Sequence, residues 1–221
     1  MRQTAFAVAT MAAALLAGDP ARAQSRGALI MEGAYDRPAS NLGFCGPCMP
    51  LWYVGAAPNT QVDFTIEDPF PSAAPVVQSA KADPFGVALY QFKPSGQGEV
   101  RLTASSGRYR VRPLGCVPPI GPPHECPPPP TSPQRVVEKE PVSIPFDEKL
   151  GTPARVLLHQ YKELPEAHWE AVVGRAVYAA KPAPQARVGK LGLRPGLYRV
   201  QFVDKEKHVL AVTLVRVDAR P

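Results

Sequence analysis

Apolar and polar side chains alternate along several short segments of the chain. The clearest examples are 109–111 and 198–202, where every second residue is aromatic or aliphatic. Successive side chains of a β-strand point to opposite faces, so the apolar set of each segment would share one buried face. The segments 87–92 and 175–180 are rich in aliphatic and aromatic residues and also predict strands. The pattern therefore predicts a chain built from short strands.

The chain contains an internal repeat. Gly86–Val100 aligns with Gly174–Val188 at a shift of 88 residues, and Leu102–Val111 aligns with Leu191–Val200 at a shift of 89. A period of about 90 residues suits a small β-sandwich and is too long for one solenoid unit. The repeat therefore predicts two modules in tandem.

The segment 165–180 fits a helix as well as a strand. Its apolar residues fall on one helical face, and Pro165 suits a helix start. The repeat favours a strand at 175–180, because the matching part of the first copy contains Asp83 and Pro84, which would disrupt a helix. For residues 165–173 the sequence does not decide between a helix and a strand.

Proline makes up 28 of the 221 residues, about 13% against a usual value of roughly 5%. Because proline interrupts helices, this frequency argues against a helical bundle and a doubly wound α/β fold. The apolar share of 45% is enough to form a packed core. We expect an all-β protein of two small antiparallel β-sandwiches.

The segments Gly107–Val111 and Gly196–Val200 share the pattern G-x-Y-R-V. This pattern resembles the penultimate strand of immunoglobulin-like and fibronectin type III-like sandwiches, where the tyrosine closes a corner by hydrogen bonding back to the chain. The second cysteine of antibody domains is replaced by Val111 and Val200. The resemblance implies the fold and says nothing about function.

The expected module boundary follows from the closing strands. In the second copy a turn leads into a closing strand at 209–217. In the first copy a Pro-rich insertion at 113–133 precedes a possible closing strand at 135–144. We therefore expect two separable sandwiches, at 24–145 and 146–221.

The N-terminus is typical of a secretory signal peptide. Arg2 precedes an apolar run at 5–17, and residues 21–23 fit the small-x-small cleavage pattern. No later stretch approaches the roughly 20 apolar residues of a membrane-spanning helix. We expect a signal peptide at 1–23 and a soluble mature protein, periplasmic or secreted.

Four cysteines in an exported chain predict two disulfides. The C-G-P-C segment at 45–48 resembles the active-site segment of thioredoxin-like oxidoreductases, and the resemblance implies an attacking Cys45 and a resolving Cys48. That chemistry needs a helix N-terminus at the first cysteine, whereas Pro50 and Gly55 follow here. Thiol–disulfide exchange is therefore the alternative to a structural role.

The other two cysteines flank nine residues of the Pro-rich insertion. We expect Cys116 and Cys126 to bridge each other and close a stiff loop. Such a loop loses little conformational entropy on binding. Val117, Ile120 and His124 are the candidate binding residues of this loop, because their side chains are free to contact a partner.

A metal site is a further alternative. Sulfur and nitrogen donors at Cys45, Cys48, Met49, His124 and Cys126 would suit copper or zinc. Neither a second C-x-x-C pair nor an H-x-x-x-H pattern accompanies them, and oxidised cysteines cannot bind as thiolates. We expect no metal and no cofactor.

Positive charge is concentrated in the second module, where no acidic residue occurs from 171 to 203. This favours an anionic partner, such as an envelope protein, an acidic glycan or a lipid surface. Nucleic acid is disfavoured because the chain lacks the stacking pattern of single-strand binders. A solvated surface without a ligand is the alternative. The candidate binding residues are Arg187, Lys190, Arg194 and Arg199, together with Arg108, Arg110 and Arg112 along one strand of the first module.

The sequence carries no motif of a hydrolase or of a phosphate-binding enzyme. We therefore expect a non-enzymatic binding or assembly module of the cell envelope. The alternative is a periplasmic protein that handles thiols or metals through Cys45 and Cys48.

Overall fold

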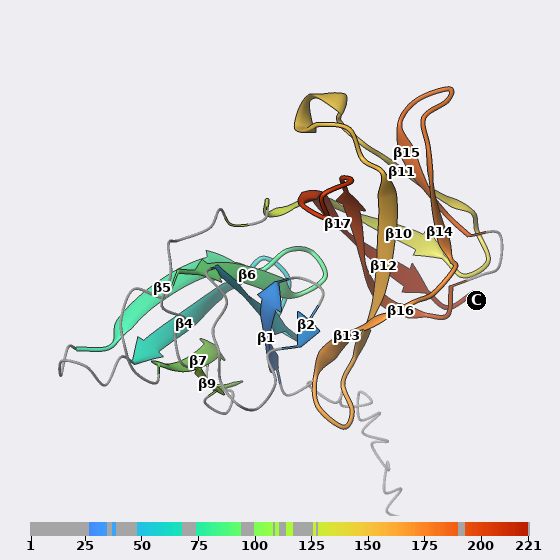
Figure 1. The fold of residues 1–221 in the computed structure, drawn as a ribbon. Helices are drawn as coiled ribbons and strands as arrows, with labels where there is room; N and C mark the ends of the chain where they lie inside the picture. Colours follow the sequence, from blue (N-terminus) through green and yellow to red (C-terminus); the bar gives the residue numbers. More distant parts are fainter. Residues whose placement is uncertain are drawn as a thin grey trace, which may run out of the picture.

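The chain is folded almost entirely into strands, arranged in two β-sandwiches (Figure 1). The computed structural model describes residues 27–34, 37–38, 48–67, 74–93, 100–107, 109–110, 114–116, 126, 128–189 and 193–220. The expected signal peptide lies outside these residues. Within them the helical structure is a single 3-10 turn, Glu148–Leu150, and no helix is long and apolar enough to cross a membrane. The prediction of an all-β fold is confirmed.

The first sandwich consists of β1 (Ala28–Ala34), β2 (Arg37–Pro38), β3 (Met49–Val54), β4 (Gln61–Glu67), β5 (Val76–Lys81), β6 (Val87–Phe92), β7 (Val100–Ser106), β8 (Tyr109–Arg110) and β9 (Leu114–Cys116). One sheet has the order β2-β1-β3-β6, and the other has the order β5-β4-β7-β8, with β9 also pairing with β7. Leu51, Phe64 and Leu102 are fully buried between them.

The second sandwich consists of β10 (Pro130–Val137), β11 (Val142–Pro145), β12 (Arg155–Lys162), β13 (His168–Ala171), β14 (Ala176–Ala179), β15 (Gln185–Val188), β16 (Gly196–Val203) and β17 (Val209–Asp218). Its sheets have the orders β10-β17-β16-β12-β13 and β11-β15-β14. β10 and β17 are parallel, whereas the other pairs of described strands are antiparallel. Ile144, Val200 and Phe202 lie in the core.

Both sandwiches have immunoglobulin-like strand order. In the second, β17-β16-β12-β13 faces β11-β15-β14, and in the first, β9-β7-β4-β5 faces β1-β3-β6. The tandem immunoglobulin-like arrangement expected from the sequence is thus confirmed at the level of the fold.

The strand pairing corrects the expected module boundary. The segment expected to close the first sandwich instead forms β10 and β11, which pair with β17 and β15 of the second sandwich. The chain passes from one sandwich to the other between Cys116 and Pro130, rather than near Pro145.

The tyrosine corner is present in the second sandwich. The Tyr198 hydroxyl donates a hydrogen bond to the carbonyl oxygen of Arg194 at 2.8 Å. In the first sandwich the long penultimate strand is β7, and Tyr109 lies on β8, which folds back onto β7 opposite Ser106. Gly107, with a φ of 57°, permits that tight turn. The prediction for Gly107–Val111 was therefore wrong.

The sequence repeat does not align equivalent strands. The repeat aligns β6 with β14. β6 pairs with β3, and in the second sandwich β11 takes the place of β3. The strand that pairs with β11 is β15, and β14 lies one strand further from β11. The match of Gly86–Val100 with Gly174–Val188 is therefore displaced by one strand.

The ambiguous segment 165–180 forms two strands, β13 and β14, so the helical alternative is excluded. Its apolar side chains do not share a core. Trp169 is buried, whereas Val173 and Val177 are 90% and 64% exposed. The segment changes from one sheet to the other after Ala171.

The turn before β6 depends on Gly86. This residue has a φ of 76°, and a Cβ there would overlap the carbonyl oxygen of Ala56. We expect Gly86→Ala to lower the free energy of unfolding by roughly 2–4 kcal/mol, from backbone strain and steric overlap. Gly107→Ala is the matched control, because its Cβ would meet no atom within 4 Å. Urea unfolding of both variants checks this, and equal losses would contradict the steric explanation.

Candidate functional site

The two sandwiches meet through sheets that are apolar on both faces. In β3, Leu51 and Tyr53 point into the first core, whereas Trp52 points toward the second sandwich. In β16, Val200 points into the second core and Leu197 points outward. We call the buried cluster between the sandwiches the seam. Its buried apolar members are Ile30, Trp52, Val87, Trp169, Leu197, Val212 and Leu214.

Arg199 lies in the centre of the seam and is fully buried. Its guanidinium carbon is 5.8 Å from the ring centre of Trp52 and 5.0 Å from that of Trp169. The two tryptophans, one from each sandwich, meet edge to face at 5.6 Å. A desolvated cation between two indole rings is a favourable cation–π arrangement. The prediction of Arg199 as a surface binding residue was therefore wrong.

Other polar side chains are buried beside Arg199. His159 lies directly opposite it on β12, and Gln201 follows two residues later on the same face of β16. His159 Nδ1, Trp169 Nε1 and both side-chain polar atoms of Gln201 are buried without a hydrogen-bond partner. Unpaired buried groups of this kind reduce stability, so the apolar contacts must offset them.

Burial, and secondly the charge of Arg199, lowers the pKa of His159 to about 4 from an ordinary value of 6.5. The unfolded chain therefore binds more protons than the folded one between these pH values, and stability is lost as the pH falls from about 6.5 to about 4. We expect a loss of up to about 3 kcal/mol from this residue.

Urea unfolding at pH 7 and pH 4 checks this expectation. His159→Gln should show a smaller acid loss than the wild type. An undiminished acid loss in His159→Gln would contradict the prediction.

A disulfide and a cation–π contact add to the seam. Cys48, at the start of β3, bonds to Cys126, shortly before β10. Arg135 of β10 lies 6.0 Å from the ring centre of Phe85, in the turn before β6. The second sandwich is thus joined to the first by a covalent bridge as well as by packing. The expectation of separable sandwiches with few mutual contacts was wrong.

The Cys48–Cys126 bond also corrects the expected cysteine chemistry. Cys126 is not paired with Cys116, so the proposed loop is not closed by its own bridge. Cys48 is not available as a resolving thiol for Cys45, and neither Cys48 nor Cys126 can serve as a thiolate ligand. The oxidoreductase alternative therefore loses its resolving thiol, Cys48, and the metal alternative loses the thiolate ligands Cys48 and Cys126.

Several exposed basic side chains of the second sandwich lie on or next to β14, β15 and the start of β16. Arg187 is in the middle of β15, and its guanidinium donates to the carbonyl oxygen of Lys181 at 3.3 Å. Arg175 precedes β14. Burial raises the pKa of the Tyr198 hydroxyl, and its hydrogen bond to Arg194 and the charges of Arg175 and Arg194 oppose this rise. We call Arg175, Lys181, Arg187 and Arg194, all exposed, the basic face.

Most of the remaining predicted binding residues lie outside the part of the chain that the structure describes. Arg108, Arg112, Val117, Ile120, His124 and Lys190 lie outside the described residues, as does Cys45. Arg110 belongs to β8, which is two residues long, so the described strand is too short for the expected ladder of three arginines. The recognition role of the Pro-rich loop stays a prediction.

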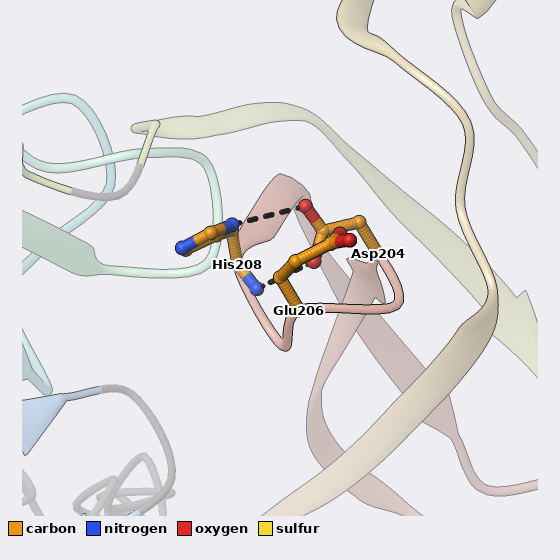
Figure 2. A group of neighbouring side chains, drawn as sticks. All are labelled: Asp204, Glu206 and His208. Atoms are coloured by element: carbon orange, nitrogen blue, oxygen red, sulfur yellow. Dashed lines mark hydrogen bonds and ion pairs between the residues drawn. The ribbon is translucent and has the colours of Figure 1, made fainter.

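A group of potential metal ligands lies in the turn between β16 and β17. Asp204, Glu206 and His208 bring ligand atoms within 4.8 Å of one another. Figure 2 shows the His208 ring close to Asp204, which also accepts a hydrogen bond from the His208 backbone N–H at 2.8 Å. Lys207, with a φ of 74°, completes a tight turn. Turn formation accounts for this group, and we assign no metal to it.

Comparisons with known proteins give only distant similarities. No family model matches the chain, and no curated protein matches it. A tetra-tandem repeat from the extending region of a large adhesion protein is 13% identical, with a TM-score of 0.30, over 87% of this chain and 49% of that one. The present chain thus spans about half of that structure.

Two titin structures are also similar. One is 11% identical, with a TM-score of 0.24, and covers 81% of this chain and 93% of its own. The other, a pair of immunoglobulin domains, is 11% identical, with a TM-score of 0.25, and covers 78% and 88%. At such low TM-scores the assignment of the fold rests on strand order and the tyrosine corner.

Proposed function

We propose that this chain is an exported, non-enzymatic binding module of the cell envelope, and that the basic face binds an anionic partner. The observation that carries the proposal is the setting of Arg187. Its cross-strand neighbours are Ser143 and Val177, both exposed and neutral. Its charge is therefore not compensated by a carboxylate on either neighbouring strand.

The surroundings of Arg187 support the same interpretation. Arg135–Asp218 and Lys162–Glu170 are ion pairs of the described residues, and Asp204 contacts the ring of His208. Lys181, Arg187 and Arg194 take part in none of these. Together with the absence of acidic residues from 171 to 203, this leaves a local positive potential that attracts anions.

The seam and the disulfide give this binding face a fixed support. A face held on a rigid pair of domains is ordered before it binds, so binding loses less conformational entropy than it would on a flexible chain. The N-terminal sequence pattern of a signal peptide supports an envelope or extracellular location.

Binding of the mature protein to an acidic polysaccharide and to vesicles of anionic or neutral lipid tests the proposal. We expect salt-sensitive binding to one of the anionic surfaces and none to neutral vesicles. Lys181→Gln/Arg187→Gln/Arg194→Gln should lower the affinity at least tenfold. A control variant, Lys149→Gln/Lys205→Gln/Arg220→Gln, makes the same change in net charge at exposed positions elsewhere.

The control variant should bind nearly as well as the wild type. Equal losses in the two variants would show that net charge alone drives binding. A failure of the wild type to bind any of the anionic surfaces would overturn the proposed function.

A further inference from the structure

Strand β5 forms an open edge of the first sandwich. It lies at the margin of its sheet and pairs only with β4 among the described strands (Figure 1). Its six residues are exposed except for Ala80, which is half-buried. Val76 and Val77 point to opposite faces and are 50% and 55% exposed. The backbone groups along its outer side have no backbone hydrogen-bond partner in the described part of the chain.

The middle of this edge has none of the usual protections against pairing. Natural proteins shield edge strands with charges, prolines or bulges, because open backbone groups invite another strand. The pairing of β5 with β4 runs without a bulge from Val76 to Lys81. Proline and charge occur only at its two ends, at Pro75 and Lys81.

We propose that β5 is a dimerisation edge, at which two copies of this chain pair antiparallel through their β5 strands and join two five-stranded sheets into one. An antiparallel pair of identical strands is two-fold symmetric, so the contact closes on itself and does not grow into a fibre. Pro75 and Lys81 limit its length at both ends.

The composition of β5 fits one register. With the symmetry axis at Gln78, Val76 of one copy faces Ala80 of the other, and Val77 faces Ser79. The two Gln78 amides meet at the axis, where each can donate to and accept from the other. This reciprocity favours a second copy over an unrelated strand.

The ends of the strand also favour this register. Lys81 of one copy faces Pro75 of the other, so no like charges meet in the pair. Moving the axis to Ser79 would place Val76 opposite Ala82, which is buried and hydrogen-bonded to Thr60.

Sedimentation equilibrium of the mature protein over a range of concentrations tests the proposal. A strand pair alone buries less area than a standard interface, so we expect a weak dimer that is populated only at high concentration. Gln78→Lys and Gln78→Glu should each be monomeric, because like charges would meet at the axis. A mixture of these two variants should dimerise again.

Thr152→Lys, at an exposed position of the second sandwich, is the charge-matched control and should dimerise like the wild type. Because Gln78 is exposed, its variants should melt at the wild-type temperature. A monomeric wild type at the highest concentration would overturn the proposal, as would a mixture of the charge variants that stays monomeric. Equal loss of dimer in Thr152→Lys would also overturn it.

Discussion

Replacing Trp52 with alanine should lower the free energy of unfolding by about 3–5 kcal/mol, the range for a fully buried tryptophan. The side chain is completely inaccessible and contacts the second sandwich through Trp169 and Arg199. Its removal would leave a cavity in the seam and a buried cation with one aromatic partner fewer. Urea unfolding measures the loss.

The seam predicts a second consequence of Trp52→Ala. Because Trp52 points away from the core of the first sandwich, that core should stay folded while the two sandwiches change their mutual orientation. Small-angle scattering should therefore detect a more extended molecule under native conditions. Val173→Ala, at a valine that is 90% exposed and lies outside both the seam and β5, is the control and should change neither quantity. A loss below about 1 kcal/mol for Trp52→Ala would contradict a packed seam.

Removing the Cys48–Cys126 bridge should have an effect of similar size. The bridge joins residues 78 positions apart, and loop-closure entropy assigns about 4.5 kcal/mol to a cross-link of that length. We expect Cys48→Ser/Cys126→Ser to lose most of this amount in urea unfolding. The loss acts through the unfolded chain, so the folded variant should keep the tryptophan contacts of the seam.

Peptide mapping without reduction provides the control for this experiment. It should recover Cys48 linked to Cys126, and Cys45 and Cys116 then have only each other as intramolecular partners. Recovery of Cys116 linked to Cys126 would contradict the structure. An unchanged stability of the double variant would show that the bridge constrains little.

The sequence predicts the strands and the fold class better than it predicts the seam. Alternation at 198–202 correctly places Val200 and Phe202 in a core. The same alternation suggested that Arg199 faces solvent, because a charged residue between apolar ones is usually exposed. Here a second sandwich covers that face, and no local pattern reveals a partner that is remote in sequence.

One signal of the seam was present in the sequence. Residues 51–54 and 209–215 are nearly continuous apolar runs, which is typical of strands buried on both faces. Trp52, Val212 and Leu214 are the residues of these runs that face the other sandwich. Disulfide connectivity could not be read in this way, because four cysteines allow three pairings and spacing alone favours the nearer one.

The Cys48–Cys126 bridge also determines how the chain would respond to mechanical tension. If the two ends were pulled apart, force would pass directly from residue 48 to residue 126 through the sulfur atoms. The strands from β3 to β9 lie inside this covalent shortcut and would carry no load along the chain. The oxidised protein would therefore keep about 260 Å of contour length in reserve, which only a reductant could release.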